Sequence, residues 1–341
     1  MSGKRMDHDG APSWVALTGG VGGAKLCLGL SRLVGGNDLA IIANCGDDFE
    51  HFGLHVSPDI DTVMYTLAGI SNPEHGWGRA DETWAFMTAM EQLGGDTWFR
   101  LGDKDLATNV ERTRRRQAGE PLSAITARLC AALGVTTTIL PATDDRLRTM
   151  LETDAGYLDF QTYLIRQAAR PAVSRIVFDG ADTARPAPGV IAALTSPALR
   201  GVIVCPSNPF VSIDPILAVA EIADVLARRR VPVIAVSPIV EGRAVKGPAA
   251  KMFRELGMQP SALEVARHYG GLIDGFVLDQ RDADLAGGID DLGVQTATAE
   301  TIMTDLDSKI DLARTVLDLA GQCRAGGIAG TAADGRTRAC G

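Results

Sequence analysis

The chain has 341 residues, of which 46% are hydrophobic and 22% are charged, and its formal net charge is −9. Such a composition supports a large buried core and excludes a disordered chain. The excess of acidic residues argues against general affinity for nucleic acid or for an anionic membrane, so any phosphate-bearing ligand must be held by local features.

The sequence carries no signal of a membrane or secreted protein. No apolar stretch approaches the roughly 18 residues that a membrane span needs, and residues 1–12 lack the apolar segment of a secretory signal. The six cysteines form no Cys-x-x-Cys pair and have no neighbouring histidine, so neither zinc sites nor disulfides are expected. We therefore expect a cytoplasmic protein whose cysteines are mostly small buried hydrophobes.

Short β-branched runs alternate with helical patterns between residues 13 and 322. This alternation predicts a single α/β domain, a Rossmann-like three-layer sandwich with a mainly parallel sheet. Residues 1–12 and 323–341 show no periodic apolar pattern and are expected to be flexible tails. Six short apolar runs, each followed by small or polar residues, are predicted as buried strands; they are residues 14–17, 39–43, 136–140, 202–205, 233–236 and 276–278.

Two helices are predicted in the second half of the chain. One begins after Ser212, with Asp214 as its cap, Pro215 near its first turn and a buried apolar stripe that continues to Leu226. The other, at about residues 308–319, is the last element. We expect it to end at Gly321, in the position after a helix that favours a left-handed backbone.

Residues 62–133 are mostly helical in pattern and carry three of the four tryptophans. They are predicted to form a helical insertion over the ligand edge of the sheet, because ligands of open α/β sheets bind beyond the carboxyl ends of the strands. Within the insertion, residues 100–108 suggest a charged helix start capped by Asp103 or Asp105, with nothing that demands catalysis. A dense basic run is expected to be a solvated helix face; it comprises Arg112, Arg114, Arg115 and Arg116.

A glycine-rich turn, TGGVGGAK at residues 18–25, directly follows the first predicted strand. Its four glycines let the backbone turn tightly, the helix that begins near Ala24 adds a positive dipole end, and Lys25 adds a charge. The turn is neither a Walker A loop nor a complete G-x-G-x-x-G, since Lys25 occupies the third glycine position. It predicts a cradle for a diphosphate, and the alternative is tight packing without a ligand.

Four carboxylates follow on two loops within fifteen residues: Asp47, Asp48, Asp59 and Asp61. Beside a phosphate cradle they would repel the ligand unless a cation bridges them, and hard oxygen ligands with a substrate phosphate suit Mg²⁺. The alternative is ordinary turn and cap chemistry. As a set near the glycine turn, they favour a metal and substrate site.

Two later loops also leave predicted strand ends. The loop after the fourth predicted strand holds Ser207 and Asn208 between two prolines, which suits a base edge or a ribose, or else a rigid turn without a ligand. The loop after the fifth predicted strand brings Arg243 and Lys246, which are either phosphate partners or part of an exposed basic loop. No nucleophile elbow and no paired metal-binding histidines occur, so acyl transfer and zinc hydrolysis are disfavoured.

Together these motifs resemble the 2-phospho-L-lactate transferases of coenzyme F420 biosynthesis, including the bacterial members that use phosphoenolpyruvate. The resemblance runs from Val15 to about Gly321. It is carried, in order, by TGGVGGAKL, NCGDDFEHFGLHVSPDIDTVMYTLAG, GWGRADETW, LGDKDLATN, LPATDD at 140–145, CPSNPFVSI and SPIVEGRAVKGPAAK.

The resemblance implies an Mg²⁺-dependent transferase and suggests a homodimer. Its donor would be a phosphorylated three-carbon acid joined to GMP through a diphosphate, and its acceptor the ribityl alcohol of the deazaflavin Fo. The products would be the phospho-acid ester of Fo and GMP. Residues 160–165, FQTYLI, depart from a more aromatic family pattern, so phospholactate, phosphoenolpyruvate and 3-phosphoglycerate all stay open as the acid.

The resemblance also implies roles for particular residues. Asp61 and Arg100 match positions that contact Fo, and Asp48 and Asp61, with Asp59 as a third, match the metal site. Lys25 would spread the developing charge, and Asp61 is a hypothetical acceptor of the hydroxyl proton. The guanine nucleotide would be held by Thr18, Gly19, Gly20, Gly22, Gly23, Lys25, Ser207 and Asn208.

Two other functions are weighed against this interpretation. A non-catalytic regulator of the related gluconeogenesis-factor type would bind a nucleotide without turnover, but its Asp-Asp turn is followed by Gly or Ser, whereas here Asp47-Asp48 leads into Phe49-Glu50-His51. A nicotinamide dehydrogenase would need an acidic residue about 20 residues beyond the glycine turn, at a strand end. Asp47 lies too far along and belongs to a carboxylate cluster.

Overall fold

The computed structural model describes residues 11–325, so the predicted tails lie almost wholly outside the described residues. Its centre is a seven-stranded sheet in which every neighbouring pair is parallel. The strand order is β14 (Gln295–Ala299), β13 (Gly275–Asp279), β10 (Val233–Val236), β9 (Gly201–Val204), β1 (Trp14–Thr18), β2 (Leu39–Ala43) and β5 (Thr138–Pro141). The predicted α/β, Rossmann-like arrangement is confirmed.

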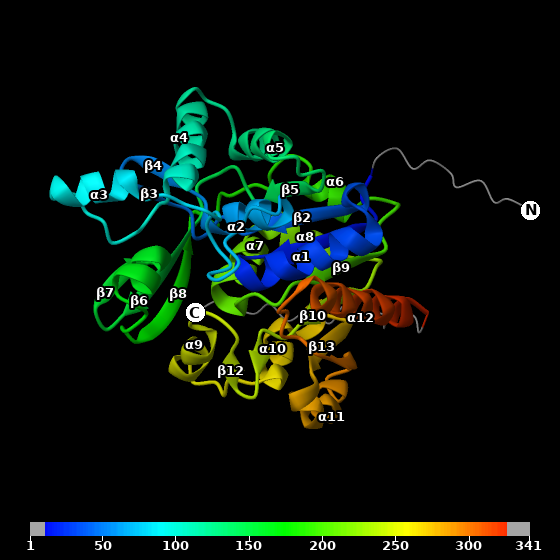
Figure 1. Cartoon of the computed structure of the whole chain (residues 1–341). Helices are drawn as coiled ribbons and strands as arrows, with labels where there is room; N and C mark the ends of the chain where they lie inside the picture. The colour runs from blue at the N-terminus through cyan, green and yellow to red at the C-terminus, as the bar shows by residue number, and fades with distance from the viewer. Residues whose placement is uncertain (1–10, 326–341) are drawn as a thin grey trace, which may run out of the picture.

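The sheet is buried because helices cover both of its faces. All residues of β1, β2, β9, β10 and β13 are buried, which explains their nearly continuous apolar sequences. The crossover through α1 (Val21–Val34) leads from β1 to β2, and the crossover through α8 (Ala220–Ala227) leads from β9 the opposite way to β10. Right-handed crossovers therefore place the two helices on opposite faces (Figure 1). The strand order reverses between β1 and β9, which is where ligands of such sheets bind.

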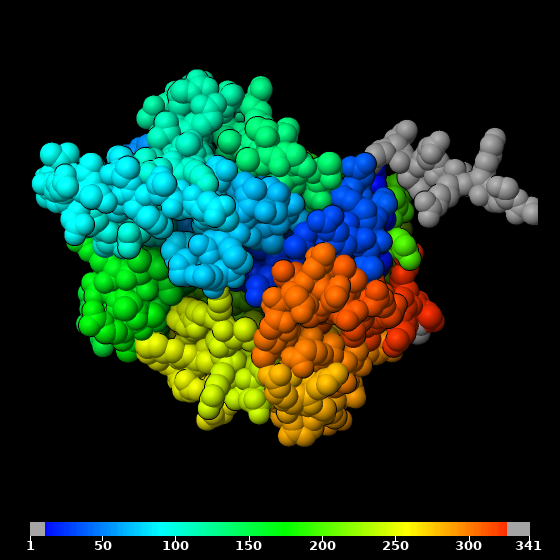
Figure 2. Space-filling model, in the orientation of Figure 1, coloured from blue at the N-terminus to red at the C-terminus, as the bar shows by residue number. Residues whose placement is uncertain are grey.

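Four helices and a hairpin fill the predicted insertion and the residues before it. The hairpin joins β3 (Phe49–His51) to β4 (Leu54–Val56). The helices are α2 (Pro58–Leu67), α3 (Ala85–Gln92), α4 (Asp103–Gln117) and α5 (Leu122–Ala132). Figure 2 shows the light-blue residues of this segment meeting the yellow-green segment near residue 246, where Lys246 Nζ donates to the carbonyl of His75.

Three smaller parts were not predicted from the sequence. An antiparallel sheet of β6 (Arg148–Thr153), β7 (Gly156–Asp159) and β8 (Val173–Asp179) projects beside α3 in Figure 1. A short pairing joins β11 (Ile239–Val240) to β12 (Arg243–Ala244), and β14 extends the main sheet. The remaining helices are α6 (Val190–Leu194), α7 (Asp214–Leu217), α9 (Ala249–Glu255), α10 (Ala262–Tyr269), α11 (Ala286–Asp290) and α12 (Leu306–Ala325).

The predicted helix after Ser212 is broken into pieces. A π-helical turn at Pro209–Ile213 is capped by Asn208, whose Oδ1 accepts from the Phe210 amide at 3.1 Å. α7 follows, and the extended backbone of the fully buried Val219 separates it from α8. Asp214 is therefore not the cap; its carboxylate lies 2.9 Å from His268 Nε2.

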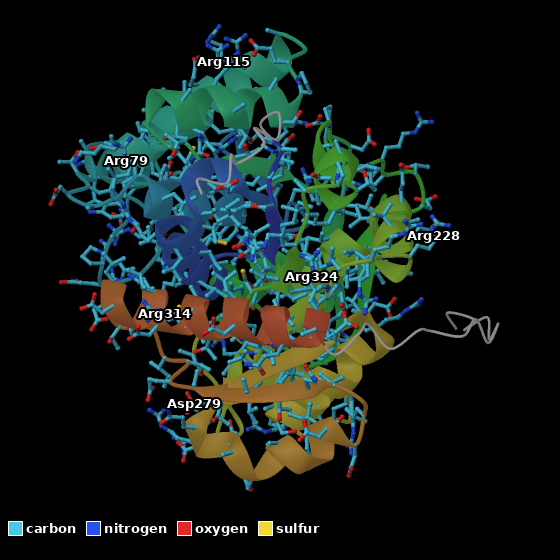
Figure 3. The ribbon with its side chains drawn as sticks, turned by 90° about the vertical axis from the view of Figure 1, so that its right-hand side faces the viewer. Arg79, Arg115, Arg228, Asp279, Arg314 and Arg324 are labelled. Atoms are coloured by element: carbon cyan, nitrogen blue, oxygen red, sulfur yellow. The ribbon has the colours of Figure 1, made fainter. Side chains whose placement is uncertain are left out.

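The last helix is longer than predicted. α12 continues through Gly321 to Ala325, so Gly321 lies inside the helix and not in the left-handed position after it. The apolar stripe explains the difference, because the buried positions of Leu319 and Ala320 continue past the expected end to Cys323. Figure 3 shows α12 running across the molecule with Arg314 and Arg324 along it. Among residues 11–325, no helix has the length and apolar character that crossing a membrane requires.

Candidate functional site

The main cavity lies beyond the carboxyl ends of β1, β2 and β9 and has a volume of about 750 Å³. Its walls come from the glycine turn, the 47–62 segment, the insertion, the residues after β7 and the loops after β9 and β10. Residues 301–303 also line the cavity. They are held in place by Asp279 at the end of β13 (Figure 3), which accepts from Thr301 N and Oγ1 at 3.0 and 2.7 Å.

The glycine turn packs tightly and still presents a helix start to the cavity. α1 begins at Val21, three residues earlier than predicted, and Gly20, Gly22 and Lys25 line the cavity. The amides of its first turn have no carbonyl partner within the helix, so they are free to bind an anion. Thr18, Gly19 and Gly23 do not line the cavity.

The glycines of the turn are required by close packing. A Cβ on Gly22 would overlap the Pro206 carbonyl, and one on Gly23 would overlap Thr18 Oγ1. Gly19 donates its amide to Ser207 Oγ at 3.0 Å, which joins the turn to the loop after β9. The packing alternative therefore accounts for part of the motif, and the same contacts bring Ser207 and Asn208 to the cavity wall.

Two of the four clustered carboxylates share one amide. Asn44 Nδ2 donates to Asp47 Oδ1 and, at 2.9 Å, to Asp59 Oδ2. Both carboxyls are buried and line the main cavity. Burial raises the pKa of Asp59 to about 7, and burial together with the neighbouring Asp59 raises the pKa of Asp47 well above its usual value. The pair is short of positive charge, and a bound cation would relieve that.

Asp61 already has a cation. Its carboxylate receives both terminal nitrogens of Arg112, a side chain with no exposed surface, and Asn109 Oδ1 accepts from the same guanidinium at 2.7 Å. Burial raises the pKa of Asp61, and the guanidinium opposes that rise. The prediction that Arg112 belongs to a solvated face is wrong. α4 instead directs this residue into the core, while Arg115 lies toward the outer end of the helix (Figure 3).

A further carboxylate, Asp105, lines the same cavity. Tyr65 donates its hydroxyl to Asp105 Oδ1 at 2.8 Å, and the structure pairs this carboxylate with no Lys, Arg or His among the described residues. Burial, together with the charge of Asp61, raises the pKa of Asp105 to about 7. Neither Asp103 nor Asp105 caps α4 as predicted: Glu82 accepts from the Lys104 and Asp105 amides there, and Asp103 instead accepts from the Ala85 and Phe86 amides at the start of α3.

Positive and aromatic groups form the rest of the lining. Lys25 donates to the Met303 carbonyl at 2.8 Å, and burial followed by the charge of Lys246 lowers its pKa. Two ammonium groups that repel each other at the start of α1 favour an anionic ligand there. Arg100 also lines the cavity and lies over the Trp84 ring at 4.5 Å. Trp98 and Phe99, which pack against each other, and Trp77, which stacks on His75, add flat apolar surface to the lining.

The predicted residues are therefore only partly brought together. Gly20, Gly22, Lys25, Ser207, Asn208, Asp59, Asp61 and Arg100 line the main cavity. Asp48 does not: it lines a second cavity, and the Arg243 side chain also lies outside the main one. Sequence reasoning named Asp47 only as a member of the carboxylate set, and it missed the parts played by Asp105 and Arg112. Helical spacing could have indicated the last two, because residues 105, 109 and 112 share one face of a helix.

The carboxylates of the main cavity fit a magnesium ion only as a site with few protein ligands. Among the described residues, no group of three or more His, Cys, Asp and Glu side chains is placed to hold a metal. The predicted trio of Asp48, Asp59 and Asp61 is not assembled, since Asp48 lies elsewhere and Asp61 is bound to Arg112. Asp47 and Asp59 remain, and Mg²⁺ is commonly held by one or two carboxylates together with ligand phosphates and water.

Comparisons with known proteins identify the family of the chain. The sequence model of a family described as 2-phospho-L-lactate transferase CofD matches residues 14–310. A phosphoenolpyruvate transferase of Streptomyces griseus is 43% identical over 317 residues, covering 91% of this chain and 99% of the relative. Another of the same name, from Streptomyces coelicolor, is 42% identical over 316 residues, covering 91% and 98%.

A solved structure supports the fold. The crystal structure of a UPF0052-family protein from Bacillus halodurans superposes with a TM-score of 0.58 and covers 89% of this chain and 98% of its own. At 13% identity, that likeness concerns the fold alone. The family match over nearly all of the sheet-forming chain, together with relatives above 40% identity, confirms the resemblance inferred from the motifs: the chain belongs to the 2-phospho-L-lactate transferase (CofD) family.

Proposed function

We propose that this chain transfers a phosphoenolpyruvyl group from a guanosine-diphosphate-linked donor to the ribityl hydroxyl of the deazaflavin Fo, releasing GMP, as a step in coenzyme F420 biosynthesis. Family membership supports the reaction type, and the names of the relatives favour phosphoenolpyruvate over phospholactate and 3-phosphoglycerate. One observation carries the proposal. A single cavity brings two lysines and a carboxylate pair that is short of a cation to the start of one helix.

The donor is assigned to the side of the cavity next to α1. The free amides of the first turn and the ammonium groups of Lys25 and Lys246 offer donors and positive charge to a diphosphate. Ser207 and Asn208 line the adjacent wall. Ser207 is held by the Gly19 amide, and Asn208 Nδ2 is engaged only by the sulfur of Met252, at 3.5 Å. That leaves the Asn208 amide as a partner for the nucleoside.

The acceptor is assigned to the aromatic side. Trp98, Phe99 and Trp77 present flat surfaces to a cavity of about 750 Å³, which is near the upper end of the usual range for ligand pockets, ~300–1,000 Å³. A tricyclic ring suits such surfaces because stacking adds to apolar burial. Arg100 lies at the same wall, in agreement with its expected contact with Fo.

Asp105 is our candidate for the proton acceptor, in place of Asp61. In the reaction, the Fo hydroxyl oxygen forms a bond to the phosphorus that carries the acid. The bond from that phosphorus to the bridging oxygen of GMP breaks, and the hydroxyl proton passes to a base. Asp61 is occupied by Arg112, whereas Asp105 has a pKa of about 7, near the optimum for a general base. Asp61 then acts by holding Arg112 and α4 in place.

Magnesium, when bound, would neutralise charge on the donor phosphates, and Asp47 and Asp59 are the residues that would hold it. Lys25 and Lys246 would stabilise the phosphate of the departing GMP, since they lie at the end of the cavity where the diphosphate is placed. No covalent enzyme intermediate is needed. Family analogy adds two expectations to the proposal, a homodimer and a cytoplasmic location; light scattering of the purified chain tests the first.

The decisive experiment offers the purified chain Fo, MgCl₂ and each of the three guanylated acids in turn. Mass spectrometry then measures the ester and GMP. We expect both products in equal amounts, formed fastest from the phosphoenolpyruvyl donor. If guanine nucleotide binds but no donor yields GMP, the chain is a non-catalytic regulator and the proposal is wrong.

The role of Asp105 has a separate test. Asp105→Asn should lower kcat by about 100-fold or more, the usual contribution of a general base. In the unmodified chain, kcat/KM should rise with pH through about 7 as Asp105 loses its proton. Tyr65→Phe removes a hydrogen bond that lowers the Asp105 pKa, so it should move that rise to higher pH. An unchanged pH profile in Tyr65→Phe would exclude Asp105.

A further inference from the structure

A second cavity of about 320 Å³ lies on the other side of the Asp47–Asp48 turn from the main one. Its lining comes from the turn, from β4, from the last turns of α4 and from the loop after β5. None of its lining residues lines the main cavity. The motif LPATDD at 140–145, which contributed to the family resemblance, ends here with Asp144 and Asp145.

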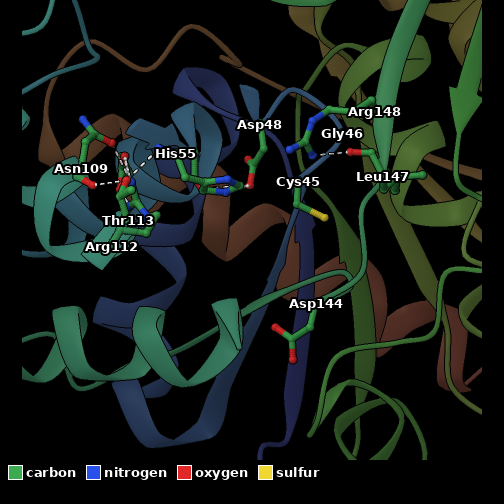
Figure 4. Close-up of polar contacts among 12 residues, drawn as sticks. Cys45, Gly46, Asp48, His55, Asn109, Arg112, Thr113, Asp144, Leu147 and Arg148 are labelled. Carbon is green, nitrogen blue, oxygen red and sulfur yellow. Dashed lines mark hydrogen bonds and ion pairs between the residues drawn. The ribbon is translucent and has the colours of Figure 1, made fainter. Parts of the chain in front are cut away.

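The innermost charge of this cavity is Asp48, whose exposed fraction is 2%. Ser57 donates its hydroxyl to Asp48 Oδ2 at 2.8 Å, and His55 Nε2 lies 3.0 Å from the same oxygen (Figure 4). The other oxygen, Oδ1, is buried and has no hydrogen-bond partner among the described residues. A buried carboxylate oxygen that lacks a donor is costly, so this atom indicates a ligand that donates to it.

Two arginine side chains of the lining also lack a carboxylate partner. Arg116 and Arg148 are partly buried, and neither forms an ion pair within residues 11–325. Arg148 donates only to the Leu147 carbonyl, at 2.7 Å, on the side of the cavity that carries Cys45 (Figure 4). Among the other charges of the lining, Asp144 accepts from Ser123 N and Oγ, Asp145 accepts from the Arg185 amide, Arg146 binds Asp179, and Glu50 is exposed.

We propose that this cavity binds a small zwitterion. Its ammonium group donates to Asp48 Oδ1, and its carboxylate or phosphate accepts from Arg116 and Arg148. A simple anion would leave the Asp48 oxygen without a donor, and a simple amine would leave both guanidinium groups unpaired. A metal ion is not favoured, because the guanidinium groups of Arg116 and Arg148, which have no carboxylate partner in the described residues, would repel it.

The size of the cavity agrees with this class of ligand. A volume of about 320 Å³ is at the lower end of the range for ligand pockets, ~300–1,000 Å³, which suits an amino acid or a phosphorylated amine with some bound water. The proposal does not depend on the transferase reaction, since the two cavities share no lining residue.

The test uses calorimetric titration of the full chain with four compounds. L-serine and phosphoethanolamine carry an ammonium group with a carboxylate or a phosphate, while inorganic phosphate and ethylamine carry one charge type each. We expect at least one zwitterion to bind about 10-fold tighter than either single-charge compound, as one additional charge-assisted hydrogen bond would give. Which zwitterion binds decides between carboxylate and phosphate as the anionic end.

Variants connect that binding to the cavity. Asp48→Asn and Arg116→Gln should each weaken the zwitterion by about 10-fold. Arg146→Gln is the matched control, because Arg146 lines the same cavity but is exposed and paired with Asp179. It should change the affinity less than about twofold. If Asp48→Asn does not fold, Arg116→Gln still decides, because its side chain forms no ion pair within the described part of the chain.

Three outcomes would overturn the proposal. The first is that neither zwitterion binds at millimolar concentration. The second is that inorganic phosphate binds as tightly as phosphoethanolamine, which would mean that Asp48 receives nothing from the ligand. The third is that Arg116→Gln and Arg146→Gln weaken binding equally, which would place the ligand outside this cavity.

Discussion

Replacing Arg112 by leucine tests whether the Asp61–Arg112 pair is a structural element of the main cavity. Both side chains are buried, with Arg112 0% and Asp61 5% exposed, and the guanidinium also donates to Asn109. Removing it leaves the Asp61 carboxylate buried without a cation. Loss of one partner of a buried ion pair costs about 3–5 kcal/mol in free energy of unfolding. Arg114→Leu is the matched control on the same helix, because Arg114 is exposed and pairs only with Glu111.

The cost of Arg112→Leu should depend on pH in a defined direction. Without the guanidinium, burial and the charge of Asp48 still raise the pKa of Asp61 and only His55 opposes them, so the folded-state pKa rises further above the unfolded value near 3.9. A group with a raised folded-state pKa favours folding below its unfolded pKa, and that benefit is lost as pH rises through the folded-state pKa. The deficit should therefore be larger at pH 8 than at pH 5.5.

Urea unfolding followed by circular dichroism measures both effects. We expect a large loss for Arg112→Leu at pH 8, a smaller one at pH 5.5, and little change for Arg114→Leu at either pH. The double variant Asp61→Asn/Arg112→Leu should recover part of the stability, because the uncompensated charge is gone. Equal losses for the two arginine variants, or a deficit that grows as pH falls, would refute the assignment of Arg112 to the core.

Three further outcomes are expected from the same assay. The pKa of Asp59 is about 7 in place of 3.8, a difference that corresponds to about 4 kcal/mol in the free energy of unfolding. Without divalent cations, the chain should therefore lose stability as pH rises from 4 to 8, and Asp59→Asn should lose less. Added Mg²⁺ should restore the stability of the unmodified chain but not that of the variant. Gly23→Ala should destabilise by about 1–3 kcal/mol, because its Cβ overlaps Thr18 Oγ1. Gly321→Ala should stabilise the chain by about 0.5–1 kcal/mol, since the residue lies inside α12 and an added Cβ would have no atom within 4 Å. If the variant is instead destabilised, Gly321 occupies the position after the helix, as the sequence predicted.

The main sheet was predictable because its strands are buried on both faces. Continuous apolar runs such as Leu39–Ala43 and Val233–Val236 have few other interpretations when helical patterns separate them. The β6–β7–β8 sheet has no such signal. Its strands are half-exposed, as in β7, where no residue is buried, and β6 pairs with β8 across an intervening helical turn. Strands of this kind are defined by their pairing partners, which local sequence does not specify.

The site was predictable at the level of loops but not of side chains. The glycine turn and the loop with Ser207 both reach the cavity, because parallel strands end at the same edge. The partners of individual carboxylates depend on contacts that are distant in sequence, such as Asp61 with Arg112, fifty-one positions apart. The basic run was misinterpreted because charge density was considered without helical phase, which separates Arg112 from Arg114 and Arg115.

The acidic residues of the chain's first third are best understood by what neutralises each one. Arg112 neutralises Asp61, whereas a phenol is the closest partner of Asp105, which has no ion-pair partner among the described residues. Asp47 and Asp59 share a neutral amide, so among the carboxylates of the main cavity they are the pair that an added cation would stabilise most. A metal beside Asp61 would compete with a guanidinium already in contact, whereas a metal between Asp47 and Asp59 would remove a repulsion. The same division of charge supports both proposals, magnesium between Asp47 and Asp59 and Asp105 as the base.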